Sequence, residues 1–378
     1  MLFNTLKRHK TIFLIILTVL AIKIALFFWA VYNFDFVAHP QNNWLSIWDR
    51  WDAGIYKTIA RSSYSFAALE PKFWFFLSHF PPLYPLLMAM ISGLFNISLL
   101  KAGVLISLAS VIAASTLLYK LTFLEFKNGK VAWFSVLLFN LYPTSYFTIS
   151  VYSESLFLLL AIAAFYYLKK SYYPASGLAA AGAILTRLAG IVFLPVYALL
   201  AFYNYRKYKF NLKTIFLPLL PFLGLITYLT INKLYFGSYF YFLTEKLSFF
   251  NTTKHLILPF KETLLDLLET FKKSNLWDRN FMMARGWNAI FTSFTLLIII
   301  LGIKRLNWTY SVYSLGSIFL FASLSWGISN ARYTLAIFPV FMILAQIKSK
   351  PLLLGILLTF AAGLLYFTKI FTSGIWAF

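Results

Sequence analysis

The feature that most limits how this chain can fold is a series of apolar stretches, each close to twenty residues long. Thr11–Tyr32 is the first, and similar stretches recur to the end of the 378-residue chain. A helix of about 20 apolar residues crosses the roughly 30 Å hydrocarbon core of a bilayer. A mean hydropathy of +0.77 excludes an ordinary soluble domain. The sequence therefore predicts a multi-pass helical membrane protein.

The apolar stretches predict an all-α polytopic fold with about nine full crossings. Ser176–Tyr203 is long and is interrupted by Arg187, Gly190 and Pro195, so we expect two half-helices that meet at Arg187. Pro82–Phe95 is too short to cross and is predicted to pack at the external surface, together with other interfacial helices. The predicted crossings are Thr11–Tyr32, Leu99–Tyr119, Val131–Thr148, Tyr152–Leu168, Thr214–Phe236, Asn288–Ile303, Trp308–Trp326, Arg332–Ala345 and Leu352–Thr372.

The distribution of charge predicts which helix ends face the cytoplasm. The connections placed on one side hold about half of the 33 basic residues and a single acid, Glu125. Because cytoplasmic loops carry an excess of Lys and Arg, we assign these connections and the N-terminus to the cytoplasm. The net charge of +22 is spread over short loops, which excludes nucleic acid as the expected partner and favours the bilayer. The connections assigned to the cytoplasm are LKRHK near the N-terminus, Lys120–Lys130, Lys169–Lys170, Arg206–Lys213, Lys304–Arg305 and Lys348–Lys350.

Two connections on the opposite, external side are long, Phe34–Pro81 and Gly237–Trp287. Long loops in a compact protein often carry function. With no internal repeat and no soluble domain, residues 1–378 are interpreted as one membrane domain, in which 34–81 is the catalytic loop. The absence of cysteine excludes disulfides and thiolate chemistry.

The first long connection contains two aspartates among tryptophans, in WDRWDAGIYKTIA. Wound as a helix at 100° per residue, this stretch places Asp52 at the border of an apolar stripe. Asp49 lies about 60° further round, with Tyr56 between them. A carboxylate at the edge of lipid is poorly solvated, so we expect a partner or a reaction to hold Asp52 there. A solvated acid that only flanks the helix remains an alternative, above all for Asp49. The stripe consists of Trp48, Trp51, Ile55 and Ile59.

Four further charged residues lie beside apolar segments. Glu154 starts the predicted helix Tyr152–Leu168, where capping by Ser153 and an acid near the dipole would also describe an ordinary helix start. Arg187 lies among Ala and Leu, and an arginine at a helix centre costs about 2.5–3.5 kcal/mol, so a partner is expected. Together with Arg332 and Lys233 it predicts a site for a lipid-borne phosphate. Snorkelling to headgroups is the alternative, mainly for Lys233.

The remaining polar residues give weaker indications. Lys23 and Lys101 are interpreted as snorkelling or packing residues. The four histidines are scattered, and the sequence contains neither a metal-binding motif nor a glycine-rich phosphate loop. We therefore expect no cofactor, and a divalent metal is left open.

Six motifs, in order along the chain, resemble those of the PIG-V-like (GPI mannosyltransferase 2-like) mannosyltransferases. Eukaryotic members of that family add the second mannose of the GPI anchor. The family belongs to the GT-C superfamily of multi-spanning, inverting enzymes that use polyprenyl-phosphate sugars and carry a catalytic acid in the first external loop. The motifs are RWDAGIY (Arg50–Tyr56), HFPPLYPLL (His79–Leu87), YSESLF (Tyr152–Phe157), LTRLAG (Leu185–Gly190), FGSYFYF (Phe236–Phe242) and ARYTLAIFPV (Ala331–Val340).

The resemblance implies a GT-C-like mannosyltransferase of a prokaryotic plasma membrane, with an external active site. The donor would be polyprenyl- or dolichyl-phosphate mannose, and the acceptor a glycolipid or glycan. The family's aspartate falls on Asp52, its YSES glutamate on Glu154 and the arginine of its broken helix on Arg187. Ser238–Tyr239 replaces the family's proline turn, so the acceptor is left open. The full set of candidates is Asp52, Asp49 and Glu154 for catalysis, Arg187, Arg332 and Lys233 for the donor phosphate, and Trp51, Tyr56, Tyr84 and Tyr152 for substrate.

Two other classes of function remain open at this stage. A transporter or flippase of lipid-linked sugars would use the same substrate, but such proteins place their charges at mid-membrane between repeats. A non-catalytic membrane scaffold would leave the loop aspartates and the arginine of the broken helix without a role.

Overall fold

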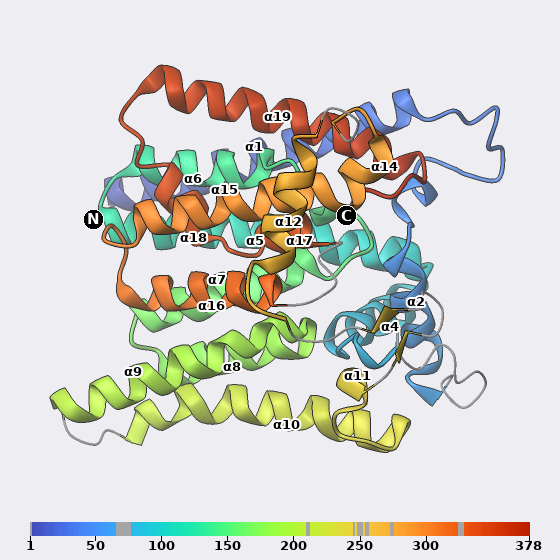
Figure 1. The fold of residues 1–378 in the computed structure, drawn as a ribbon. Coiled ribbons are helices and arrows are strands. Elements are labelled where there is room, and N and C mark those ends of the chain that lie inside the picture. The colour runs from blue at the N-terminus through green and yellow to red at the C-terminus, as the bar shows by residue number, and fades with distance from the viewer. Residues whose placement is uncertain are drawn as a thin grey trace.

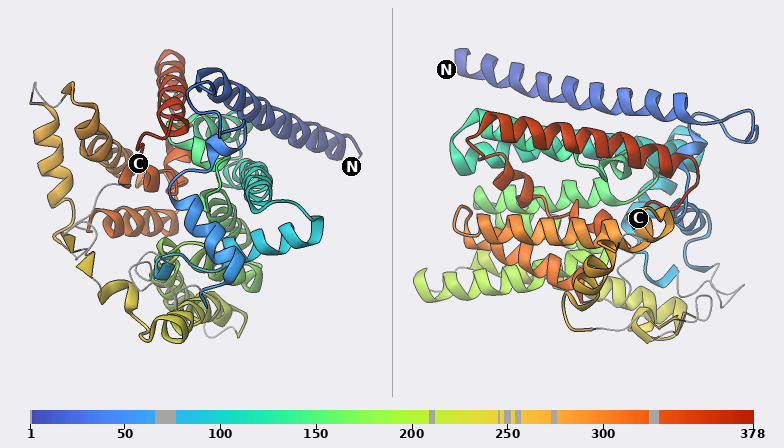
Figure 2. Two further views of the ribbon diagram at one scale, coloured as in Figure 1. Left: turned by 90° about the vertical axis from the view of Figure 1, so that its right-hand side faces the viewer. Right: turned by 45° about the horizontal axis from the view of Figure 1, so that its top comes forward.

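The computed structural model describes residues 2–65, 77–208, 212–244, 246–247, 252–253, 257–272, 276–323 and 329–378. These residues form a bundle of helices whose long members run in nearly the same direction (Figure 1). The left view of Figure 2 looks almost along most of those helices. The described strands are one antiparallel pair, β1 (Lys246–Leu247) and β2 (Thr252–Thr253).

The helices follow one another along the chain as follows. The first part contains α1 (Leu2–Asn33), η1 (Ser46–Trp48), α2 (Asp52–Ser62), α4 (Leu83–Phe95), α5 (Leu99–Phe126), α6 (Gly129–Leu141), η4 (Ser145–Thr148), α7 (Glu154–Lys169) and α8 (Tyr173–Thr186). The middle contains η5 (Leu188–Val192), α9 (Phe193–Tyr208), η6 (Leu212–Ile215), α10 (Phe216–Phe236), α11 (Tyr241–Thr244) and α12 (Lys261–Thr270). The last part contains α14 (Arg279–Phe281), a π-helical turn η7 (Met282–Gly286), α15 (Trp287–Gly302), α16 (Trp308–Ala322), α17 (Asn330–Thr334), α18 (Pro339–Leu344) and α19 (Lys350–Thr372).

Among the described residues, six helical segments are long and apolar enough to cross a membrane. The chain is therefore a multi-pass membrane protein, as predicted, but nine complete crossings are not shown. Trp326, the expected end of one crossing, lies outside the described residues. The six segments are His9–Asn33, Leu99–Phe126, Leu188–Arg206, Phe216–Phe236, Arg279–Gly302 and Lys350–Thr372.

Prolines shorten two of the predicted crossings. The crossing expected over Val131–Thr148 ends as an α-helix at Leu141, before Pro143, and continues only as the short helix η4. The one expected over Arg332–Ala345 breaks into α17 and α18, and Pro339 is the first residue of α18. Proline lacks the backbone N–H that an uninterrupted helix requires, and it disfavours helical geometry in the residue before it.

The helix predicted to break at Arg187 does so. α8 ends at Thr186, and Arg187 has extended backbone angles (φ −151°, ψ 137°) before η5 begins. Gly190 lets η5 lie directly on α8, because a Cβ atom there would be 2.6 Å from the backbone nitrogen of Ile184. The segment after the break is long enough to cross by itself, so it is more than the half-helix expected from the sequence.

Small residues bring neighbouring helices into close contact, as is common in membrane bundles. A Cβ atom on Gly177 of α8 would lie 2.2 Å from the carbonyl oxygen of Phe216 in α10. On the other side of the same interface, Gly224 of α10 approaches Ala181 of α8. α7 packs between α5 and α8, and ten of its 16 residues are buried.

The two ends of the bundle differ in the connections they carry. The basic connections assigned to the cytoplasm lie at the left end in Figure 1, as far as the structure describes them. α2 and α11, which belong to the two long connections predicted to be external, lie at the right end, as does α4, for which the sequence predicts packing at the external surface. The side of the membrane that each end faces remains a prediction.

Candidate active site

The segment that contains Asp52 forms a helix later than the sequence pattern predicts. Trp48 is the last residue of η1, and Trp51 has the unusual angles φ 50° and ψ −112°, so α2 begins at Asp52. The predicted helix over Trp48–Ala60 is therefore wrong in its first turn, because the positive φ of Trp51 interrupts helical geometry there. The Tyr152 hydroxyl donates a hydrogen bond to the Arg50 carbonyl (3.0 Å), which ties this turn to the start of α7. Asp52 thus lies at the N-terminus of a helix, a position favourable for an anion.

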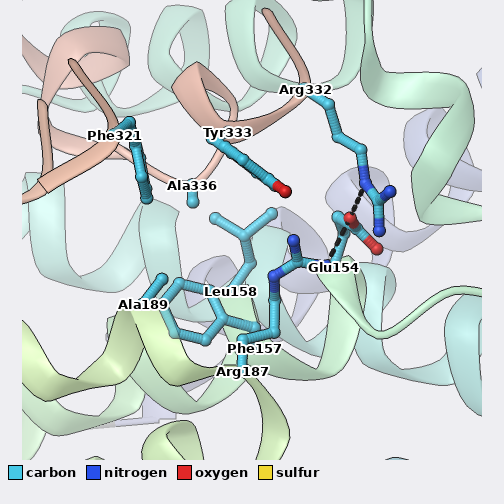
Figure 3. Close-up of a pocket in the computed structure, with 9 residues that line it drawn as sticks. All are labelled: Glu154, Phe157, Leu158, Arg187, Ala189, Phe321, Arg332, Tyr333 and Ala336. Atoms are coloured by element: carbon cyan, nitrogen blue, oxygen red, sulfur yellow. Dashed lines mark hydrogen bonds and ion pairs between the residues drawn. The ribbon is translucent and has the colours of Figure 1, made fainter. Parts of the chain in front are cut away.

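Asp52, Glu154, Arg187 and Arg332 come together in one group of ion pairs, here called the charge cluster. Arg332 donates through Nη1 to Asp52 Oδ2 (2.6 Å) and through Nε to Glu154 Oε1. Arg187 Nη1 lies 2.5 Å from the same Glu154 oxygen. Figure 3 shows the Glu154 carboxylate with Arg332 and Arg187 around it. The cluster joins α2, α7, the break after α8 and α17.

The charge cluster is mostly shielded from solvent. The exposed side-chain fractions are 4% for Glu154, 5% for Arg332 and 14% for Arg187, against 25% for Asp52. Two carboxylates and two guanidinium groups balance, which is the condition under which buried charges are tolerated. Asp52 is thus the member of the cluster most accessible from solvent.

Aromatic rings support both arginines. The Arg332 guanidinium carbon lies 4.5 Å from the centre of the Tyr152 ring and 4.9 Å from that of Phe147. Arg187 lies 5.4 Å from the centre of the Tyr333 ring. Cation–π contacts of this kind stabilise a desolvated guanidinium and fix its plane.

Tyr56 and Ser153 connect α2 to the cluster. The Tyr56 hydroxyl lies 2.6 Å from Ser153 Oγ, which also accepts a hydrogen bond from Arg187 Nη1 (3.2 Å). Burial raises the pKa of Tyr56 above its ordinary value of 10, so the phenol keeps its proton at physiological pH. The Ser153 side chain makes no capping hydrogen bond to α7, so the capping part of the helix-start interpretation is wrong, whereas Glu154 does lie in the first turn of α7, near the positive end of the helix dipole.

A small cavity of about 10 Å³ adjoins the charge cluster (Figure 3). One wall contains Glu154, whose Oε2 atom is buried and has no hydrogen-bond partner among the described residues. This volume is close to the space that one water molecule needs, so a larger ligand would enter only after the walls move apart. Among the described residues, no group of three or more His, Asp or Glu side chains could hold a metal ion. Besides Glu154, the small cavity is lined by Phe157, Leu158, Arg187, Ala189, Phe321, Arg332, Tyr333 and Ala336.

Two charged candidates lie outside the charge cluster. Asp49 pairs with Lys57 of α2, so it makes a local ion pair within its own segment. Lys233, at the end of α10, donates to the Gly237 carbonyl (2.9 Å) and lies near the Tyr239 ring. The expected convergence of three cations is therefore wrong for Lys233, because the carbonyl at the end of its own helix is the nearer partner.

The aromatic candidates divide in the same way. Tyr56 and Tyr152 contact the cluster, as described above. Tyr84 is fully buried; its hydroxyl bonds to the Gly103 carbonyl (3.2 Å) and to Ser107 (3.1 Å), and its ring packs edge-on against Tyr56. Trp51 is 44% exposed and packs edge-on against Trp376.

Sequence reasoning missed several residues that position the cluster. Ser153 and Tyr333 are direct neighbours of Glu154 and Arg332 in the motifs, so adjacency alone could have indicated them. Asn288 has no such signal. Its Oδ1 atom accepts a hydrogen bond from the Ala331 N–H (2.8 Å), which fixes the start of α17 just before Arg332.

Comparisons with known proteins identify a similar fold at low sequence identity. No protein-family model matches the chain, and a search of curated proteins gives no match. Among solved structures, ArnT from Cupriavidus metallidurans bound to undecaprenyl phosphate aligns with a TM-score of 0.52 and 12% identity, over 91% of this chain and 62% of that chain. ArnT in the apo state gives 0.47 at 14% identity, over 74% and 52%. The Archaeoglobus fulgidus oligosaccharyltransferase gives 0.43 at 12% identity, over 79% and 45%.

The first of these similarities shows the fold alone. The chain spans about 62% of the length of the ArnT structure that it matches. Its helical architecture is thus similar to that of ArnT, in agreement with the multi-pass helical membrane fold predicted from the sequence.

Proposed function

We propose that this protein is a membrane glycosyltransferase that takes a hexose from a polyprenyl-phosphate sugar and transfers it to an acceptor hydroxyl with inversion. The observation that carries the proposal is the charge cluster, in which Arg332 holds the partly buried Asp52 beside the buried Glu154. This arrangement lies in a fold similar to that of ArnT, which was solved with undecaprenyl phosphate bound. The resemblance of the motifs to PIG-V-like enzymes points to mannose and to an active site on the external face.

Asp52 acts as the general base in this proposal. The acceptor oxygen attacks the anomeric carbon and its proton passes to Asp52, while the bond from that carbon to the phosphate oxygen breaks. Polyprenyl phosphate leaves, and a single displacement inverts the configuration. A carboxylate is a weak base towards an alcohol, so proton transfer accompanies attack rather than preceding it.

The two arginines stabilise the leaving phosphate. Arg332 and Arg187 already lie in a site of low exposure, where a fixed positive charge acts more strongly than in water. The donor phosphate competes with Asp52 for Arg332, and its arrival releases the carboxylate for its role as a base. Glu154 keeps both guanidinium groups in place throughout, as a positioning residue.

The test compares Asp52→Asn with Asp49→Asn, a matched variant in the same segment. We expect Asp52→Asn to lower the transfer rate about 100-fold to 10,000-fold, the usual contribution of a general base. Asp49→Asn should stay within a few fold of wild type, because the Asp49 carboxylate is engaged by Lys57. The measurement is product formation from labelled polyprenyl-phosphate mannose, with the glucose-linked donor in parallel, in membranes that contain equal amounts of inserted protein.

Three results would contradict the proposal. Wild-type turnover by Asp52→Asn would remove Asp52 from the base role, and an equal loss in both variants would show an effect of the segment as a whole. Binding of the labelled donor without any product would favour a transporter of lipid-linked sugars.

A further inference from the structure

A second cavity, of about 390 Å³, lies between α1 and α5. Its volume falls within the range of roughly 300–1,000 Å³ that is typical of small-molecule sites. Phe27, Phe28, Val104 and Leu108 form much of an apolar lining, and no member of the charge cluster contributes to it. It is therefore a separate site from the one described above.

The cavity opens on a surface that faces lipid in a multi-pass protein. Two of its residues on α1, Ile24 and Phe28, are 52% and 64% exposed. α1 packs against α5, α6 and α19 and lies at the edge of the bundle (Figure 2). A membrane lipid can thus reach the cavity sideways, from the bilayer.

Two hydrogen-bond donors in this lining lack adequate partners. Lys23 is 3% exposed, and its only hydrogen bond among the described residues is a long one, from Nζ to the Ser145 carbonyl (3.4 Å). The structure thus shows Lys23 buried rather than snorkelling. Trp48 is 1% exposed, and its Nε1 is buried without a hydrogen-bond partner among the described residues.

The chemistry of these two donors defines the ligand. A buried ammonium group without an anion is costly, and so is an unpaired indole N–H. One oxyanion with a single negative charge would satisfy both groups and neutralise Lys23. A headgroup with hydroxyls, esters or a second charge would bring polar atoms for which this apolar lining has no further partner.

We propose that the cavity between α1 and α5 binds a single-chain lipid that ends in one singly charged oxyanion, of which a long-chain carboxylate is the simplest form. The oxyanion accepts hydrogen bonds from Lys23 Nζ and Trp48 Nε1. The chain lies against Phe27, Phe28 and Leu108. Trp48 ends the short helix that leads into α2, so the bound lipid lies beside the segment that carries Asp52. The proposal does not depend on the reaction proposed above.

The test measures binding of palmitate and of hexadecanol, which has the same chain without the charge, to the delipidated full chain in detergent by native mass spectrometry. We expect wild type to retain one palmitate at least about tenfold more tightly than hexadecanol. Lys23→Met should remove this preference, and Trp48→Phe should weaken palmitate binding several-fold. Lys101→Met, which changes an exposed lysine on the adjoining α5, should bind as wild type does.

Other results would overturn the proposal. Equal binding of palmitate by wild type and Lys23→Met would exclude Lys23 as the partner of the anion, and equal binding of palmitate and hexadecanol by wild type would exclude an oxyanion site. Displacement of palmitate by phosphatidylglycerol at equal concentration would identify a two-chain phospholipid as the occupant instead. If Lys23→Met does not fold, the proposal is still tested by two comparisons: palmitate against hexadecanol on wild type, and palmitate binding by Trp48→Phe against wild type.

Discussion

At the scale of single residues, Arg332 is the side chain on which the candidate site most depends. Its guanidinium bonds one carboxylate through Nε and another through Nη1, which no other basic side chain can do with the same planar geometry. Lysine carries the same charge but offers a single flexible ammonium group. The function of this position therefore rests on shape as well as on charge.

Arg332→Lys tests this dependence. We expect at least a 100-fold loss of transfer and a lower melting temperature, because lysine cannot bond both carboxylates: either Asp52 loses its partner or Glu154 keeps only Arg187. Transfer assays and thermal unfolding in detergent measure the two effects. Arg285→Lys is the matched control, since Arg285 pairs with Asp266 outside the cluster and its side chain is 47% exposed. A variant Arg332→Lys with normal activity would contradict the bridging role.

The sequence could identify the members of the charge cluster but not their pairing. Asp52, Glu154, Arg187 and Arg332 stand out because an ionisable side chain beside apolar neighbours is costly unless it has a partner. Which partner it takes depends on how distant helices pack, and Arg332 reaches Asp52 across 280 residues of sequence. Lys233 is also an ionisable side chain beside apolar neighbours, yet it donates its hydrogen bond to the Gly237 carbonyl at the end of its own helix.

At the scale of elements, the break between α8 and η5 sets the position of Arg187. The interruption could be predicted because arginine, glycine and proline lie in one apolar stretch. The start of α2 could not be predicted, because a positive φ at Trp51 does not change the spacing of apolar residues along the sequence. A positive φ at a residue other than glycine is uncommon and is imposed by the surrounding packing.

Gly190→Ala tests the contact that holds the break in place. The added methyl group would meet the backbone of α8 at 2.6–2.8 Å and push η5 away, together with Arg187. We expect a loss of about 1–3 kcal/mol in stability and a weaker use of donor, measured by thermal unfolding and by the Michaelis constant for the donor.

Gly93→Ala provides the control for Gly190→Ala. Gly93 lies in α4, and nothing lies within 4 Å of a Cβ atom there. Alanine should therefore be neutral or stabilising by up to about 1 kcal/mol. Equal effects of the two substitutions would show that η5 is not tightly packed on α8.

At the scale of the whole molecule, the separation of basic connections from long connections predicts a single orientation in the membrane. The charge bias could be read from the sequence, because it is a property of composition along the chain. The number of complete crossings could not, because short helices such as α7 are enclosed by other helices, and their length is set by packing rather than by the thickness of the bilayer.

The absence of cysteine makes this orientation easy to measure. Single cysteines at Gln41, Asn128 and Lys304 would each occupy an exposed position, the first in the 34–81 region and the other two in basic connections. In intact cells, a membrane-impermeant maleimide should label Gln41→Cys only. Asn128→Cys and Lys304→Cys should react after permeabilisation. Labelling of the basic connections in intact cells would reverse the assignment.

The ion pair that joins α2 to α17 also has a consequence for biosynthesis. A ribosome makes Asp52 first, then Glu154 and Arg187, and reaches Arg332 only after 280 residues beyond Asp52 have been translated. Until then the nascent chain has one more acid than cation at the place where these helices meet. Assembly of the charge cluster is thus a late event in synthesis, and a product that ends before Arg332 would keep one unbalanced carboxylate.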